Sequence, residues 1–243
     1  MRRIHFICGE KSGVGKSVMA RLLAQYYLDR AIPFKAYDAD RSDGSLLRHY
    51  SGYCEVEDIS QFGDACRILE QAQRSGSTAI LDISAQASQS LNRWIDESRL
   101  FDSAIGLGLS LTFWHLMDES PDSLLRLKRL FANYGEKPDY VVVRNYGCGI
   151  DFSSLEESEI CLVLQHYGAR VIDLHALHRP TMRKIDHINA SFWDAANNTN
   201  SELGPTLGLL ERQRVRTWLN RTYDHLDLLH KDYLATESSS ISS

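Results

Sequence analysis

The chain has 243 residues, of which 43% are apolar and 24% charged, so it can bury a full core and is neither disordered nor fibrous. Its 27 basic and 32 acidic side chains give a formal net charge of −5, which excludes a whole-protein attraction to nucleic acid or anionic lipid. The five cysteines show no C-x-x-C pairing, and no segment suits a signal peptide or a membrane span. This composition predicts a soluble protein of the reducing cytoplasm.

The predicted elements alternate between strands and helices. The chain opens with an apolar strand over Ile4–Cys8, and apolar residues at helical spacing follow Ser17. Further strands are predicted at Pro33–Tyr37, Thr78–Ile83, Ser110–Met117, Tyr140–Arg144 and Arg170–Leu174, and further helices at Asp64–Arg74, Ser123–Asn133, Leu155–Tyr167 and Leu207–Leu229. Such alternation predicts an α/β fold with a mainly parallel sheet and helices on both faces. We expect a single domain over residues 1–232 and a disordered, serine-rich polar tail over 233–243.

A glycine-rich loop, GEKSGVGKS, joins the first predicted strand to the first predicted helix. A loop in this position directs backbone N–H groups into a small cavity at the positive end of the helix dipole, which suits phosphate. The residues expected to bind a nucleotide there are Gly13, Val14, Gly15, Lys16, Ser17 and Val18. Lys16 can reach the β and γ phosphates, and Ser17 offers a hydroxyl to Mg²⁺. The alternative is a chance match, and Glu10 stands where the loop pattern has glycine.

Three aspartates lie where predicted strands end. Asp38 and Asp40 follow the second strand, and Asp82 lies near the end of TAILDI. Ligands of a parallel sheet gather at the carboxyl ends of its strands, so all three can face the loop. We expect Ser17 and Asp82 to hold Mg²⁺, with Asp38 as a further candidate; the alternative is that these carboxylates cap turns.

The loop contains a second lysine, Lys11, five residues before Lys16, and this spacing indicates a particular kind of phosphate-binding loop. The string KSGVGKS resembles the deviant Walker A signature K-G-G-x-G-K-[ST] of the MinD/ParA family of P-loop ATPases, in the SIMIBI class. In that family the early lysine reaches across a dimer to the partner's phosphates. The resemblance implies a homodimer around ATP and Mg²⁺, in which Lys11 acts in trans and Lys16 in cis.

The same resemblance assigns roles to residues beyond the loop. It places Asp38 and Asp40 on the D-x-D of the second strand, where the second aspartate positions the attacking water. Asp82 falls on the switch II aspartate, and Asn145 matches the residue that contacts the adenine edge. Lys11, Lys16 and Asp40 are therefore the expected catalytic residues.

Short cues favour the TraL-type ATPases of conjugative plasmids within this family. They are the opening R-x-I-H-F-I, the string NYGCG, and INASFWDA after the last predicted strand. The chain also departs from the family pattern. Ser12 replaces a glycine, Arg41 stands where a proline is frequent, and DISAQAS lacks the proline or glycine of a mobile switch II. These departures predict slow hydrolysis or none.

The region from Glu211 to Asp232 is the candidate for a membrane-binding helix, by analogy with MinD. Its five basic and four acidic side chains give a net charge of only +1, so we expect it to pack on the sheet. Arg212, Arg214 and Arg216 could add a small patch for nucleic acid, which the overall charge disfavours. His115 is expected to be a packed strand residue rather than a proton shuttle.

The leading hypothesis is an ATP-dependent dimerising switch that serves plasmid transfer, partition or positioning by recruiting a partner protein. Two other classes remain open. One is a metabolic ATP-dependent enzyme of the dethiobiotin synthetase or cobyrinate amidation type. The other is a nucleotide-binding module without turnover.

Overall fold

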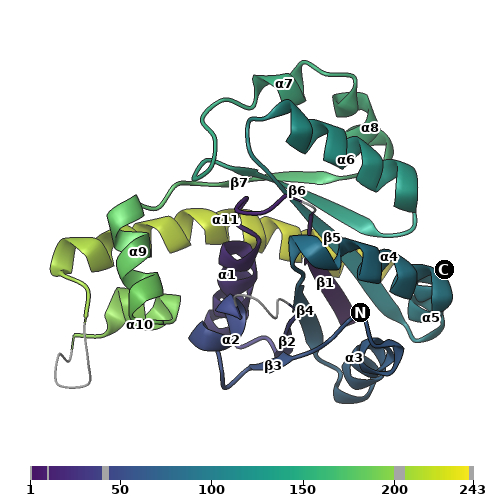
Figure 1. Ribbon diagram of the computed structural model, residues 1–243, viewed down its shortest axis with the longest axis horizontal. Coiled ribbons are helices and arrows are strands. Elements are labelled where there is room, and N and C mark those ends of the chain that lie inside the picture. Colours follow the sequence, from purple (N-terminus) through teal and green to yellow (C-terminus); the bar gives the residue numbers. More distant parts are fainter. Residues whose placement is uncertain (1, 10, 40–43, 200–205, 241–243) are drawn as a thin grey trace.

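A seven-stranded sheet organises the computed structural model, which describes residues 2–9, 11–39, 44–199 and 206–240 (Figure 1). The strands are β1 (Arg2–Cys8), β2 (Phe34–Asp38), β3 (Cys54–Val56), β4 (Thr78–Asp82), β5 (Leu109–Met117), β6 (Asp139–Asn145) and β7 (Arg170–Leu174). Their order across the sheet is β3-β2-β4-β1-β5-β6-β7, and every pairing is parallel. The predicted α/β architecture is confirmed.

Helices cover both faces of the sheet (Figure 1). One face carries α1 (Lys16–Asp29), α2 (Ser45–His49), α9 (Arg179–His187), α10 (Phe192–Asn197) and α11 (Leu209–Ser240). The other carries α3 (Phe62–Ser75), α4 (Ser88–Glu97), α5 (Leu100–Gly106), α6 (Pro121–Tyr134), α7 (Ser153–Glu156) and α8 (Ile160–His166), with a short 3-10 turn, η1 (Ala85–Ala87), before α4. The sheet therefore separates two apolar cores.

Strand β6 shows why the sheet is buried on both sides. Successive side chains of a strand point to opposite faces, and here Tyr140 and Val142 enter one core while Val141 and Val143 enter the other. All four are buried. Four consecutive apolar residues in a strand leave no side for solvent, which is typical of a parallel sheet between two helical layers.

The predicted strands lie within about two residues of the observed ones, while short elements escaped prediction. The elements not predicted include β3, α2, α4, α5, α9 and α10. Most are short, and α4 carries only a narrow apolar stripe of Leu91, Trp94 and Ile95. The helix predicted over Leu155–Tyr167 is two helices, α7 and α8. Glu159 stands at the start of α8, where negative charge favours a helix N-terminus.

Helix α11 packs on the face that carries α1, as the sequence predicted (Figure 1). The Tyr26 hydroxyl of α1 donates a hydrogen bond to Asp227 at 2.8 Å, and the Tyr223 hydroxyl of α11 donates one to Asp29 at 2.7 Å. The helix continues to Ser240, through residues where the sequence analysis expected a disordered tail. No glycine or proline interrupts it, and serine weakens a helix only mildly. No helix among the described residues is long and apolar enough to cross a membrane.

Candidate functional site

The glycine-rich loop lies between β1, which ends at Cys8, and α1, which begins at Lys16. Gly13 and Gly15 both have positive φ, at 74° and 98°, a conformation that glycine adopts without steric cost. Gly15 is the N-cap of α1, and no side chain caps the helix there. The first backbone N–H groups of α1 therefore remain available to an anion at the positive end of the helix.

Asn145, at the end of β6, holds this loop in place. Its side-chain Nδ2 donates to the Val14 carbonyl at 2.8 Å, and its Oδ1 accepts from the Gly147 N–H at 2.9 Å. A Cβ on Gly15 would lie 2.4 Å from Asn145 Nδ2, so only glycine fits this approach. The resemblance assigned Asn145 to the adenine edge. In the structure its amide fixes the loop backbone, a contact that the sequence analysis did not foresee.

A cavity of about 630 Å³ lies in front of the N-terminus of α1. Its lining includes Ser12, Gly13, Gly15, Lys16, Ser17 and Val18 from the loop, Ser45 and Arg48 from α2, and Gln86 from η1. Lys16 Nζ donates to the Lys11 carbonyl at 2.7 Å, which keeps the ammonium group over the loop. Three basic side chains (Lys16, Arg21 and Arg48) and one carboxylate, Asp186, also line the cavity, and Asp186 is paired with Arg21. Together with the hydroxyls and backbone donors, the remaining positive charge suits phosphate groups.

A second cavity, of about 260 Å³, lies on the other side of Gly13 and Gly15. Its walls are more apolar and include Leu174, Leu177, Met182 and Trp218 as well as Asn145, Cys148, Arg179 and Arg183. Trp218 is fixed by a hydrogen bond from its Nε1 to the His175 carbonyl at 2.6 Å. The loop is therefore flanked by a polar cavity on one side and an apolar cavity with a few polar groups on the other.

Asp38 and Asp82 lie side by side on neighbouring strands. The two residues are paired in the register of β2 and β4, and Asp82 is also aligned with Ile7 of β1. Both are about 1% exposed, and Asp38 Oδ2 accepts a hydrogen bond from the Leu47 N–H of α2 at 3.0 Å. The sheet thus brings both carboxylates to the edge where the loop begins. Asp40 lies outside the described residues.

The oxygen groups at this edge are of the type that Mg²⁺ prefers. Ser17 lines the larger cavity, whereas Asp38 and Asp82 end their two strands and are not part of its lining. Within the described ranges, no group of three or more His, Cys, Asp and Glu side chains is arranged to hold a metal ion. The donor set fits an ion that takes most of its ligands from phosphate and water and few from protein.

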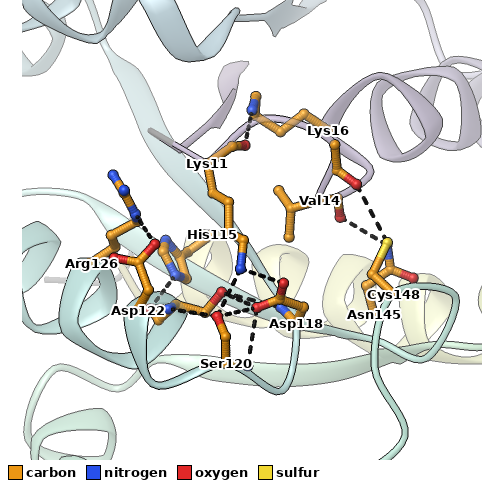
Figure 2. Close-up of polar contacts among 12 residues, drawn as sticks. Lys11, Val14, Lys16, His115, Asp118, Ser120, Asp122, Arg126, Asn145 and Cys148 are labelled. Atoms are coloured by element: carbon orange, nitrogen blue, oxygen red, sulfur yellow. Dashed lines mark hydrogen bonds and ion pairs between the residues drawn. The ribbon is translucent and has the colours of Figure 1, made fainter.

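The Lys11 side chain runs from the loop to Asp118 and Ser120, which follow the carboxyl end of β5 (Figure 2), and it is not part of the lining of the larger cavity. Its Nζ lies 2.5 Å from Asp118 Oδ2 and donates to Ser120 Oγ at 2.7 Å. Asp118 Oδ1 also accepts hydrogen bonds from the Ser120 and Ser123 hydroxyls, at 2.7 and 2.6 Å. Desolvation raises the pKa of the Asp118 carboxyl, but the bonds from Lys11, Ser123 and Ser120 outweigh it and hold that pKa well below its usual range.

The sequence around Asp118 contained a signal for this arrangement. Asp118, Ser120 and Pro121 follow the predicted strand Ser110–Met117, and Pro121 occupies the first turn of α6 with Ser120 as its N-cap. A serine followed by proline and an acidic residue is typical of a helix start. The motif therefore indicates where polar side chains gather, but not that Lys11 reaches them.

His115 is buried in β5, as expected. Its Nε2 lies 3.2 Å from the Ser123 carbonyl, and burial lowers the pKa of its imidazole to about 4. The ring is neutral at physiological pH and lies against the first turn of α6 (Figure 2).

Comparison with known proteins identifies the fold. No protein-family model matches the sequence, and no curated protein matches it at a significant level. Among solved structures, a chain of the MinC:MinD cell division protein complex of Aquifex aeolicus aligns with a TM-score of 0.56 at 11% identity, over 91% of this chain and 95% of that one. The MinD cell division protein of the same organism aligns with a TM-score of 0.53 at 12% identity, over 91% and 96%.

A third solved structure is a nucleotide-binding protein from Archaeoglobus fulgidus in complex with ADP. It aligns at 12% identity over 76% of this chain and 86% of that one, and its TM-score of 0.49 is too low to support an argument. The two MinD structures support the fold alone, because the sequence identities are low. The chain therefore has the α/β fold of the MinD-type P-loop NTPases.

Proposed function

We propose that the chain is an ATP-binding switch that forms a homodimer around Mg-ATP, hydrolyses the nucleotide slowly and thereby recruits a partner protein. The observation that carries the proposal is the loop at the start of α1. Its glycines have the required positive φ, the helix N-terminus has no side-chain cap, and Lys16 and Ser17 line the polar cavity in front of it.

The two cavities beside the loop support a placement for ATP. The triphosphate would occupy the larger cavity, against the N–H groups of α1 and the Lys16 ammonium. The base would enter the apolar cavity lined by Leu177 and Met182, within reach of Asn145. Ser17, Asp38 and Asp82 would hold Mg²⁺, directly or through water, and the ion would spread the charge that develops on the phosphates.

Lys11 would complete the site of a second subunit. In this structure its ammonium is bound to Asp118 and Ser120, so a reach across a dimer requires that these contacts break. A triphosphate carries more negative charge than one carboxylate and offers a favourable exchange. The Lys11 contact thus gives a physical reason for dimerisation to depend on the nucleotide: without the partner's phosphates, the side chain has a satisfied position on its own subunit.

The rate of hydrolysis would be low. Asp40 is the proposed residue that orients the attacking water. The segment that follows Asp82 contains no glycine, and its η1 turn packs directly before α4, so a large movement of this segment has few hinges. A slow intrinsic rate suits a switch whose turnover is set by a partner.

The biological setting is inferred from resemblance. One of the matched MinD structures is a complex with MinC, which makes recruitment of a protein a reasonable mode of action for this fold. The TraL-like cues in the sequence direct the proposal to plasmid conjugal transfer or mobilisation, with partition and positioning as related roles. The proposed location is the cytoplasm. A nucleic-acid contact has little support, because the net charge is −5.

The test is light scattering coupled to size exclusion, with ATP, ADP or no nucleotide present. We expect a dimer with Mg-ATP only, and a monomer under every condition for Lys11→Ala. Lys128→Ala is the matched control, because Lys128 is an exposed lysine of α6 that forms no hydrogen bond or ion pair with any residue the structure describes. Dimers that form equally with ADP, or that survive Lys11→Ala, contradict the proposal.

Phosphate release in the same samples separates the alternatives. Slow release from ATP alone fits the switch. Release only after addition of a small carboxylic acid favours a metabolic enzyme, and tight ATP binding without any release favours a binding module.

A further inference from the structure

A groove of about 410 Å³ lies away from the nucleotide loop, between the C-terminal end of α1, the turn from α2 to β3 and the start of α10. We refer to it as the α1–α10 groove. Its lining includes Gln25, Asp29, His49, Tyr53, Trp193 and Asp194. Nothing in the proposed ATP cycle uses this groove.

Two aromatic side chains of the groove are exposed. Trp193 is 53% exposed and Tyr53 is 47% exposed, whereas the other three tryptophans, Trp94, Trp114 and Trp218, are buried. Tyr53 is held through its ring, and Trp193 through its backbone. Tyr53 stacks on Phe34, and the Trp193 backbone N–H donates to Gln25 Oε1 at 2.9 Å. Large aromatic surface that is left open beside a groove is a feature of binding sites rather than of ordinary surface.

The same groove is acidic. Asp29 and Asp194 are exposed at its lining, and neither forms an ion pair in the part of the chain that the structure describes. Asp29 accepts hydrogen bonds from Gln25 and Tyr223, and Asp194 bonds Ser191, so all their partners are neutral. His49 is the one basic residue in the lining of the groove. Burial is the main reason that the pKa of its imidazole is lowered, and the positive charge of Arg21 lowers that pKa further. The imidazole is therefore neutral at pH 7.

We infer that the α1–α10 groove binds an arginine or lysine side chain from a basic segment of a partner protein. A cation placed over an aromatic face gains from the ring quadrupole, and the two carboxylates of the groove offer it charge-assisted hydrogen bonds. An acidic segment would be repelled, and a neutral apolar segment would leave the carboxylates desolvated without a partner. The charge of the groove therefore selects the basic segment.

The groove is connected to the nucleotide cavity through α2. His49 and Tyr50 line the groove, while Ser45 and Arg48 line the larger cavity beside the loop. The Leu47 N–H of the same helix donates to Asp38. A shift of α2 on nucleotide binding would therefore move one wall of the groove. The inference goes beyond the proposed function, and binding is measured first without nucleotide, so that it can fail while the ATP switch stands.

Trp193 provides the assay, because it is the exposed tryptophan of the four. An arginine-rich peptide should change its emission saturably, and the change should weaken at high salt. The same peptide with citrulline in place of arginine keeps the shape and loses the charge. We expect its affinity to be about tenfold lower, which corresponds to about 1.4 kcal/mol.

Variants locate the site. Asp194→Asn should lower the affinity for the arginine peptide about fivefold, within the range for loss of one exposed charge-assisted contact. Asp224→Asn, which removes an exposed carboxylate of α11 outside the groove, should have no effect. Asp29→Asn serves as a second variant in case Asp194→Asn perturbs α10, and circular dichroism checks the fold of each. Trp193→Phe should abolish the emission change.

Several outcomes overturn the inference. These are equal binding of the citrulline peptide, stronger binding of a leucine peptide, or affinities unchanged by both Asp194→Asn and Asp29→Asn. Self-association of the chain that competes with the peptide would assign the groove to a second copy instead.

Discussion

The carboxyl ends of β1 and β5 lie on neighbouring strands, yet they handle charge in opposite ways. At the end of β1, backbone N–H groups and Lys16 face a cavity, and glycines shape the loop. At the end of β5, Asp118 is surrounded by Lys11, Ser120 and Ser123, and the charges are neutralised within the chain. The end of β1 is arranged for a ligand, whereas the polar side chains at the end of β5 already have partners within the chain. Lys11 belongs to the loop of the first and is bound at the second.

The largest expected effect comes from the loop backbone. Gly15→Ala places a Cβ against Asn145 at a residue with positive φ, and strain plus overpacking should lower the free energy of unfolding by about 4 kcal/mol. Nucleotide binding should be lost as well. Gly13→Ala is the matched control, because Gly13 has a similar φ but no atom within 4 Å of an added Cβ, so its cost should be about 1 kcal/mol. Urea unfolding measures both, and equal effects would contradict the role of the Asn145 contact.

The next effect concerns the buried imidazole of His115, near the carboxyl end of β5. Residue His115 is aligned with Cys8 of β1, and its pKa is about 4 in the folded state against an ordinary 6.5. Between these two pH values the unfolded chain binds the proton and the folded chain does not, so stability falls as the pH falls. From pH 7 to pH 4 the wild type should lose about 3 kcal/mol more than His115→Gln. Urea titrations across this range measure the difference, and parallel curves would rule out a neutral buried histidine.

A smaller effect is expected at the end of β5. Asp118→Asn keeps the shape but weakens the contacts with Lys11 and the serines, at a cost of about 2 kcal/mol at pH 7. The folded pKa of Asp118 is lowered, so its contribution is present above pH 4 and is lost as the pH falls through the folded value. The gap between wild type and variant should therefore close below pH 4. A gap independent of pH would mean that charge has no part in holding Lys11.

The smallest expected effect is the loss of a helix N-cap. Comparing two such caps separates the contribution of capping to stability from that of the Lys11 contact. Ser120→Ala removes the N-cap of α6 and a partner of Lys11, and Ser191→Ala removes the N-cap of α10, which Lys11 does not contact. Each should cost about 1 kcal/mol in thermal or urea unfolding. The cap bond of Ser120 is long, at 3.4 Å, against 3.0 Å for Ser191. A cost for Ser120→Ala that equals or exceeds that of Ser191→Ala would therefore show that the Lys11 and Asp118 contacts add to the cap.

The difference between the two ends also explains what the sequence could predict. The β1 end was predictable because its determinants are local: a strand, glycines, a lysine and a helix within residues 4–27. Asp38 and Asp82 followed from the rule that parallel strands present ligand groups at their carboxyl ends, and the register places them side by side. No long-range contact was needed for either prediction.

Contacts between distant segments were beyond the reach of local patterns. Lys11 and Ser120 are 109 positions apart, and Asn145 and Val14 are 131 positions apart. Nothing in the spacing of either pair indicates that they meet. The α1–α10 groove is similar, since its walls come from helices whose order in the chain does not reveal that they are neighbours. Short elements such as α2 were missed because one or two turns carry too little periodicity.

The position of α11 has a consequence for how the protein is made. Tyr26 and Asp227 are 201 positions apart, and the ring of Tyr233 lies under the guanidinium of Arg3, 3.6 Å away. The ribosome therefore releases α1 long before α11, the helix that covers it. The apolar side of α1 stays exposed to solvent until synthesis is nearly complete. A message truncated before α11 would yield a product with the whole glycine-rich loop and an uncovered core, which is a substrate for proteases and chaperones rather than a smaller working protein.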